Sequence, residues 1–167
     1  MKTIMRNSTY LPIVAIFLAA ALAGPAVADD KLVPFSGSLH AKESIVLQGV
    51  PPGTFVADGS GGGIATHLGL FTLTWKFTVV IADGTGSGPV HYIAANGDEI
   101  FTTSAGTSEP TSTPGVFRIM EVQTITGGTG RFANAKGSFI VDRLTDLNTG
   151  FTSGSFHGAI TSPGSAK

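Results

Sequence analysis

The sequence predicts an all-β protein whose strands close into a barrel. Residues 71–81 alternate between large apolar and mostly polar side chains, which is the pattern of an antiparallel strand with one buried face. Of the 23 glycines, 22 follow residue 28, among many Thr, Val, Ile and Phe residues, as expected for strands joined by tight turns. The glycine-rich stretch 124–139 is typical of the end of a closed barrel, and we find no helical periodicity longer than one turn.

The first 28 residues are predicted to be a secretory signal peptide. Lys2 and Arg6 form the charged start, residues 11–22 form the apolar run, and Ala26-Val27-Ala28 provides the cleavage site. The apolar run is too short to span a bilayer, which takes about 20 residues. We therefore expect a soluble mature form, and the absence of cysteine favours a bacterial periplasmic or secreted protein.

Residues 29–162 are expected to form one barrel domain, followed by a tail over 163–167. Loss of the signal peptide leaves eight basic and eleven acidic residues, a net charge of 8 − 11 = −3. The basic residues are scattered singly, so no basic stripe follows a phosphate backbone and no nucleic-acid partner is expected. The four histidines show no metal-ligand spacing, so neither a metal nor a cofactor is predicted.

The first predicted strand runs from Phe35 to about Glu43, with every second side chain facing inward. If the strand continues that far, Glu43 points into the barrel near a mouth. The alternative, which we favour, is that the strand frays first and Glu43 is solvated, because acidic residues are rarely buried without a partner. The prolines and the glycine of the segment Val50-Pro51-Pro52-Gly53 then interrupt any continuation of this strand.

A glycine-rich segment, 58–63, is expected to be a flexible loop that leads into a short strand over 64–69. This strand turns at Gly69 into the longest one, 71–81. Trp75 and Phe77 lie on its apolar face, where a core side chain of a barrel is also a wall of any cavity.

The middle of the chain carries a strong hairpin signal at Asn96-Gly97, between strands predicted at 90–94 and 99–103. A turn region over 83–89 precedes this hairpin. Residues 104–115, which are rich in Ser, Thr and Pro, are expected to be a solvated connection.

The next strand, 116–126, has two faces that are equally apolar. One face brings Glu121 inward and the other brings Arg118 inward, and an inward charge needs a partner, water or a ligand. Beyond the glycine-rich stretch, Phe139, Val141 and Arg143 share one face of a further strand. A hairpin loop over 146–150 leads to the last strand, whose inward residues are predicted to be Phe156, Gly158 and Ile160.

Residues 127–137 are Gly-Gly-Thr-Gly-Arg-Phe-Ala-Asn-Ala-Lys-Gly. This segment resembles the Gly-Gly-Thr-Gly-(basic)-Phe-Ala-x-Ala-x-Gly signature of the allene oxide cyclase and dirigent barrel superfamily. The resemblance implies a single calycin-like barrel of eight antiparallel strands. Its corner would be formed by Gly127, Gly128, Gly130, Phe132 and Gly137, with the phenylalanine as an apolar plug. No catalytic residue of those enzymes lies in the motif, so the motif carries architecture and not activity.

Three functions are open at this level. The first is binding of a small hydrophobic molecule by an exported barrel, as the resemblance implies; the second is a cyclase or isomerase of the allene oxide cyclase type; the third is a filled barrel with a structural or interaction role. No nucleophile motif is present, and the sequence leaves catalysis and oligomeric state open. The candidate cavity wall consists of Trp75, Phe77, Phe139, Val141, Glu43 and Glu121.

Cleavage of the signal peptide after Ala28 is the first testable prediction. The exported protein is expected to begin at Asp29, because the small residues before it fit the signal peptidase site. Intact-mass measurement of the exported protein checks this. An uncleaved species retained in the membrane would contradict it.

Overall fold

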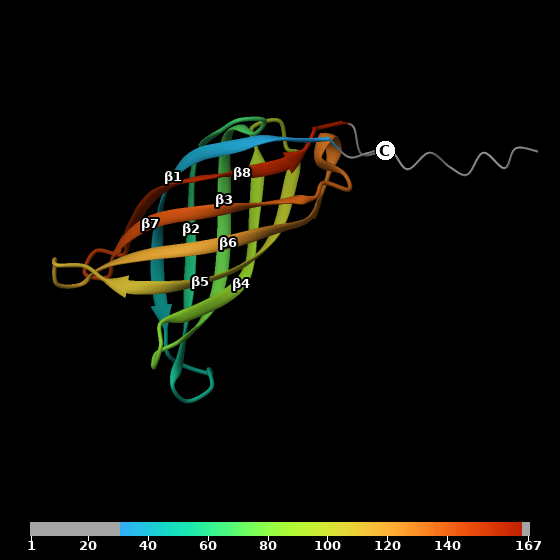
Figure 1. Cartoon of the computed structure of the whole chain (residues 1–167). Coiled ribbons are helices and arrows are strands. Elements are labelled where there is room, and N and C mark those ends of the chain that lie inside the picture. The colour runs from blue at the N-terminus through green and yellow to red at the C-terminus, as the bar shows by residue number, and fades with distance from the viewer. Residues whose placement is uncertain (1–30, 165–167) are drawn as a thin grey trace, which may run out of the picture.

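The computed structural model describes residues 31–164, which form a closed antiparallel barrel of eight strands (Figure 1). The predicted signal peptide lies outside the described residues. A short 3-10 helix, η1 (Gly130–Phe132), separates the sixth and seventh strands. The strands are β1 (Leu32–Val46), β2 (Thr54–Ala65), β3 (Gly69–Val80), β4 (Thr85–Ala94), β5 (Glu99–Pro110), β6 (Val116–Gly128), β7 (Gly137–Asp146) and β8 (Phe151–Thr161). The expected all-β, eight-stranded antiparallel barrel is thereby confirmed.

Each strand pairs with the next along the chain, and β1 closes the barrel against β8, beside which it lies in Figure 1. The connections therefore alternate between the two ends of the barrel. One end, which we call the plugged end because Phe132 closes it, carries the β2–β3, β4–β5 and β6–β7 connections. The other end, which we call the open end because a cavity opens there, carries the other four. Both ends of the described chain lie at the plugged end, where Ser162 N–H donates to Lys31 C=O at 2.9 Å and Gly164 N–H donates to Arg131 C=O at 2.7 Å.

Apolar side chains fill the plugged end. Three phenylalanine rings, Phe35, Phe139 and Phe156, pack together with centroid separations of 5.1 to 5.2 Å. Phe132 of η1 closes this end and is 1% exposed. In the predicted corner, Gly130 has a φ of 55°, and a Cβ there would meet the Asp98 carboxylate, so both the backbone and the space favour glycine.

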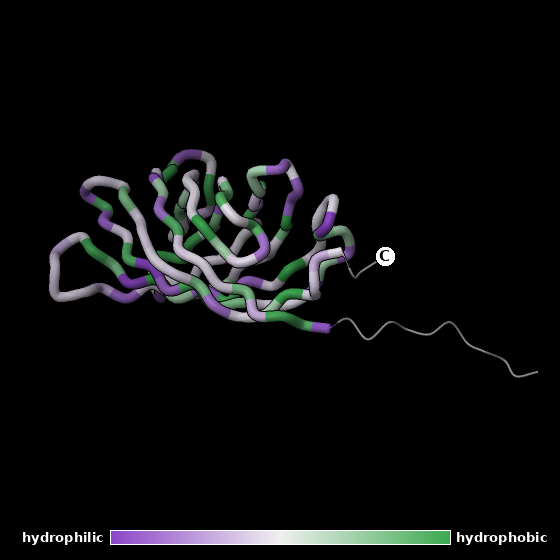
Figure 2. Tube along the Cα trace, turned by 90° about the horizontal axis from the view of Figure 1, so that it is seen from above, coloured by the Kyte–Doolittle hydropathy of each residue, from purple (hydrophilic) through white to green (hydrophobic). Residues whose placement is uncertain are grey.

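The alternation of buried and exposed residues places one apolar face inward along most of the barrel, and Figure 2 shows hydrophobic residues interspersed with neutral and hydrophilic ones along the chain. In β3 the buried residues are Phe71, Leu73, Trp75 and Phe77, as the sequence predicts. The hairpin at Asn96-Gly97 is found where it was predicted, with Gly97 at a φ of 86°. Within residues 31–164, no helix is long and apolar enough to cross a lipid bilayer.

Two segments that were expected to be loops are strands. Residues 58–63 form the middle of β2, and residues 104–110 complete β5, so that only 111–115 connects β5 to β6. In β2 the glycines admit side chains of the neighbouring strand: a Cβ at Gly59 would overlap the indole of Trp75. Glycine has a weak strand propensity, but here it is outweighed by the pairing of β2 with β1 and β3. The missing side chains also leave space for core residues such as Trp75.

Two smaller boundaries also differ from the prediction. The turn region predicted over 83–89 is shorter, because β4 already begins at Thr85. The short strand predicted over 64–69 is the end of β2 and a turn, in which His67 has a φ of 65°.

The inward face of β6 carries Glu121, and Arg118 faces outward, where it pairs with Asp142. The favoured interpretation of Glu43 as a solvated residue is wrong. Strand β1 continues to Val46, and the Glu43 side chain is only 5% exposed. Its burial is possible because partners reach it from β3 and β7, as described below.

Replacement of Phe132 by Ala is expected to lower the free energy of unfolding by about 3 to 5 kcal/mol, because it empties a fully buried plug. Phe151→Ala removes the same atoms from a ring that is 46% exposed and serves as the matched control. Chemical denaturation of both variants measures the difference. Equal effects of the two substitutions would mean that Phe132 does not stabilise the plugged end.

Candidate functional site

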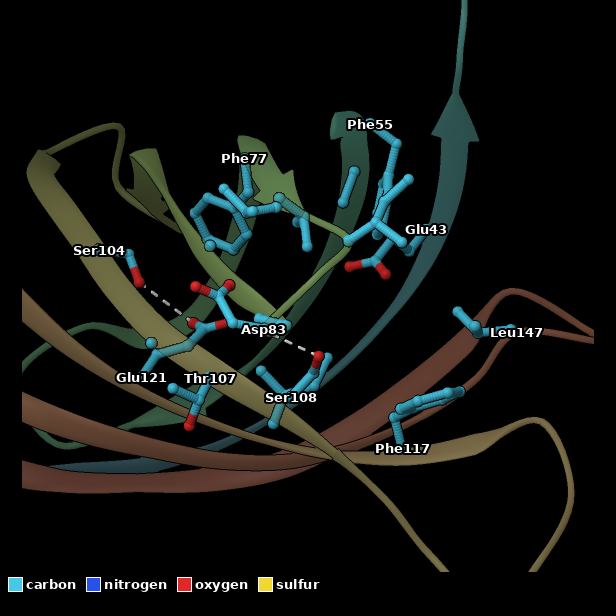
Figure 3. Close-up of a pocket in the computed structure, with 18 of the residues that line it drawn as sticks. Glu43, Phe55, Phe77, Asp83, Ser104, Thr107, Ser108, Phe117, Glu121 and Leu147 are labelled. Atoms are coloured by element: carbon cyan, nitrogen blue, oxygen red, sulfur yellow. Dashed lines mark hydrogen bonds between the residues drawn. The ribbon is translucent and has the colours of Figure 1, made fainter. Parts of the chain in front are cut away.

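The open end of the barrel contains a cavity of about 450 Å³ (Figure 3). This volume lies in the range of about 300 to 1,000 Å³ that small-molecule sites occupy. Its walls are mostly apolar and include Phe55, Phe77, Val79, Phe117, Ile119 and Leu147. Ile81 and Leu147, from the loops after β3 and β7, line its mouth and are 59% and 43% exposed, so the cavity opens to solvent there.

Three charged side chains, Glu43, Glu121 and Arg143, form the charged floor of this cavity. The guanidinium of Arg143 lies between the two carboxylates. Its Nε and Nη2 donate to Glu121 Oε1 at 3.1 and 2.9 Å, and its Nη1 donates to Glu43 Oε2 at 3.2 Å. Each of the three side chains is at most 5% exposed, so these are buried ion pairs held by charge-assisted hydrogen bonds.

Neighbouring side chains fix the position of Arg143. Its Nη1 also donates to the hydroxyls of Thr145 and Thr152 at 2.7 and 3.1 Å. The Trp75 ring centroid lies 5.3 Å from the guanidinium carbon, within the range of a cation–π contact. The indole N–H of Trp75 donates to Glu43 Oε2 at 3.1 Å, so one aromatic side chain supports both members of the ion pair.

The second carboxylate is tied to a polar network that continues below the floor. Glu121 Oε2 accepts hydrogen bonds from Ser104 and Gln123, both at 3.3 Å. Gln123 Oε1 in turn accepts from Tyr92 and Thr102, both at 2.9 Å. Burial, reinforced by the negative charge of Glu121, raises the pKa of the Tyr92 phenol, which therefore stays protonated as a donor. Such connected buried networks hold their members in one arrangement.

The predicted wall residues occupy three levels along the barrel. Glu43, Glu121 and Phe77 line the cavity. Trp75 and Val141 lie beneath it, against Arg143. Phe139 packs among the rings of the plugged end and does not reach the cavity, because side-chain alternation fixes the face of a strand but not the depth along the barrel.

Arg143 was not predicted as a site residue, although it shares a strand face with Val141. The sequence could have indicated it, because an inward Glu121 needs a cationic partner and Arg143 is an inward basic residue of the neighbouring strand. Phe55 was missed for another reason, because residues 58–63, the middle of its strand, were interpreted as a loop. Among residues 31–164, no group of three or more His, Asp or Glu side chains is arranged to hold a metal ion.

The closed barrel of eight antiparallel strands, with one plugged and one open end, has a dirigent-like fold. Among solved structures, the chain is similar to that of the pterocarpan synthase dirigent protein GePTS1, with a TM-score of 0.60 and 15% sequence identity. The similarity covers 82% of this chain and 93% of that chain, and at this identity it establishes the fold alone. No family model matches the sequence, and no curated protein matches it.

Replacement of Arg143 by Met is expected to destabilise the protein by about 3 to 5 kcal/mol, because two buried carboxylates lose the cation that they share. Arg118→Met makes the same chemical change in the exposed pair with Asp142 and is expected to have a much smaller effect. Urea denaturation of both variants checks this. Similar losses in the two variants would show that burial does not govern the strength of these pairs.

Proposed function

We propose that the protein binds a small, largely apolar molecule in the cavity at the open end, with a polar group of that molecule at the charged floor. The observation that carries this proposal is the combination of apolar walls with a buried, pre-positioned charged group at the bottom of an accessible cavity. Binding sites for small molecules commonly have this composition, in which a few polar groups orient a ligand that is held by apolar contacts.

The apolar walls account for affinity in this proposal, and the charged floor accounts for orientation. Each Å² of apolar surface removed from water contributes about 25 cal/mol before the costs of association. The floor needs no rearrangement on binding, because Thr145, Thr152 and Trp75 already hold Arg143 in place. The third alternative, a filled barrel with a structural role, accounts less well for an open cavity of about 450 Å³.

A second candidate function is a cyclase or isomerase of the allene oxide cyclase type. The buried carboxylates of Glu43 and Glu121 at the cavity wall favour it, because buried ionisable groups in a cavity are candidates for proton transfer. The structurally similar GePTS1 is itself named as a synthase. In this candidate function the barrel would shape a reactive substrate, and a carboxylate of the floor would accept or return a proton.

We also propose that binding takes place outside the cytoplasm. The support for this is the predicted signal peptide over residues 1–28 and the absence of cysteine. Export would give the open end access to molecules of the periplasm or the medium.

Ligand titration monitored by Trp75 emission tests the binding proposal. Trp75 is the only tryptophan and contacts both Glu43 and Arg143, so a ligand at the charged floor changes its surroundings. Small aromatic alcohols and alkyl alcohols are expected to give saturable changes, with calorimetry as an independent measurement. No saturable response from any apolar probe would contradict the proposal.

Matched phenylalanine variants locate the site. Phe77→Ala removes a cavity wall and is expected to weaken binding about tenfold, which corresponds to about 1.4 kcal/mol. Phe101→Ala removes the same atoms from a residue that is 37% exposed and does not line the cavity, so binding should be unchanged. If both variants bind like the unmodified protein, the ligand lies elsewhere.

A further inference from the structure

The cavity carries an excess of acidic groups. Its ionisable lining residues are Glu43, Asp83, Glu121 and Arg143, with a formal charge of 1 − 3 = −2. Asp83 belongs to the loop after β3, and hydrogen bonds from Thr85 hold the pKa of its carboxyl below its usual value, so that this residue is charged at neutral pH. An anion that enters the cavity therefore meets more negative than positive charge.

The one cationic group in this lining offers little to an anion. Arg143 uses four of its five N–H donors on protein partners: one each from Nε and Nη2 on Glu121, and the two of Nη1 shared among Glu43, Thr145 and Thr152. A carboxylate ligand could form a bidentate pair with the guanidinium only by displacing Glu43 or Glu121. Such an exchange would leave a buried carboxylate without its cation, which is strongly unfavourable.

The two carboxylates of the charged floor differ in how many of their oxygens accept a hydrogen bond from the protein. Both oxygens of Glu121 accept hydrogen bonds, Oε1 from Arg143 and Oε2 from Ser104 and Gln123. Glu43 accepts two hydrogen bonds at Oε2, but no hydrogen bond from within residues 31–164 reaches its Oε1. The Glu43 side chain is only 5% exposed, and Figure 3 shows its carboxylate directed into the cavity.

We propose that Glu43 Oε1 is the recognition point for the polar end of the ligand, and that the cavity selects an apolar molecule with an ammonium group over the same molecule with a carboxylate. The ammonium N–H would donate to Glu43 Oε1 while the apolar part lies along Phe77 and Ile119. A cation there offsets the negative charge of the cavity, and an alcohol can donate the hydrogen bond without offsetting the charge. This inference rests on the binding function proposed above.

A series of probes with one tail and three head groups tests the selectivity. Decylamine, decanol and decanoate are titrated near neutral pH into the mature protein, by calorimetry and by Trp75 emission. Decylamine is expected to bind at least about tenfold more tightly than decanoate, with decanol between them. Decanoate binding as tightly as decylamine would overturn the inference but leave the binding function standing. Failure of all three probes would remove both.

Glu43→Gln tests the assignment of the recognition point. The amide keeps the size of the side chain and its acceptor for Trp75 but removes the charge, so decylamine affinity is expected to fall about tenfold and decanol affinity to change little. Glu109→Gln removes the same charge from an exposed residue of β5 outside the cavity lining and should leave all three affinities unchanged. Equal losses of decylamine affinity in both variants would overturn the role of Glu43.

The titrations of the unmodified protein test the selectivity even if the Glu43→Gln variant does not fold, because they need no substitution. Circular dichroism of the variant separates a loss of fold from a loss of recognition. A folded Glu43→Gln protein that keeps its preference for decylamine over decanoate would also overturn the role of Glu43.

Discussion

A buried guanidinium between two buried carboxylates is the constraint on which the rest of this barrel depends. Charges taken out of water must be paired, and the three partners here come from β1, β6 and β7. Glu43 and Arg143 are 100 residues apart in the chain and meet only because β1 closes against β8, next to β7. Pairing of the charges therefore requires closure of the barrel, and a slip of one residue in any of these strands would turn a charge out of the lumen.

The charged floor also divides the lumen into two parts with different contents. Below it, aromatic rings fill the plugged end, and inward glycines serve this packing: Gly37 lies where the Phe156 ring needs space. Above it, inward positions such as Gly86 and Gly106 lie on the wall of the cavity. Glycine therefore does not by itself indicate an empty lumen. Its effect depends on whether a neighbouring side chain is long enough to fill the space. The Phe156 ring does so at Gly37, whereas the space beside Gly86 and Gly106 is part of the cavity.

Features set by neighbours in sequence could be predicted, and those set by pairing between distant strands could not. The alternation in β3 and the turn at Asn96-Gly97 are local, so both were found where they were expected. Gly59 was placed in a loop, because only the Trp75 indole across the sheet explains a glycine in a strand. Glu43 was expected in solvent for the same reason, since its cation lies on a strand that the sequence alone does not bring to it.

Both ends of the described chain leave the barrel at the plugged end, through the contacts of Ser162 with Lys31 and of Gly164 with Arg131. The mouth of the cavity lies at the other end. An affinity tag, a fused domain or a solid support joined directly at residue 31 or at residue 164 would therefore be attached on the side away from the mouth. Residues 31–164 can be immobilised on a sensor chip from either end with the cavity facing the solution, and a reporter domain can be fused at these points without blocking entry.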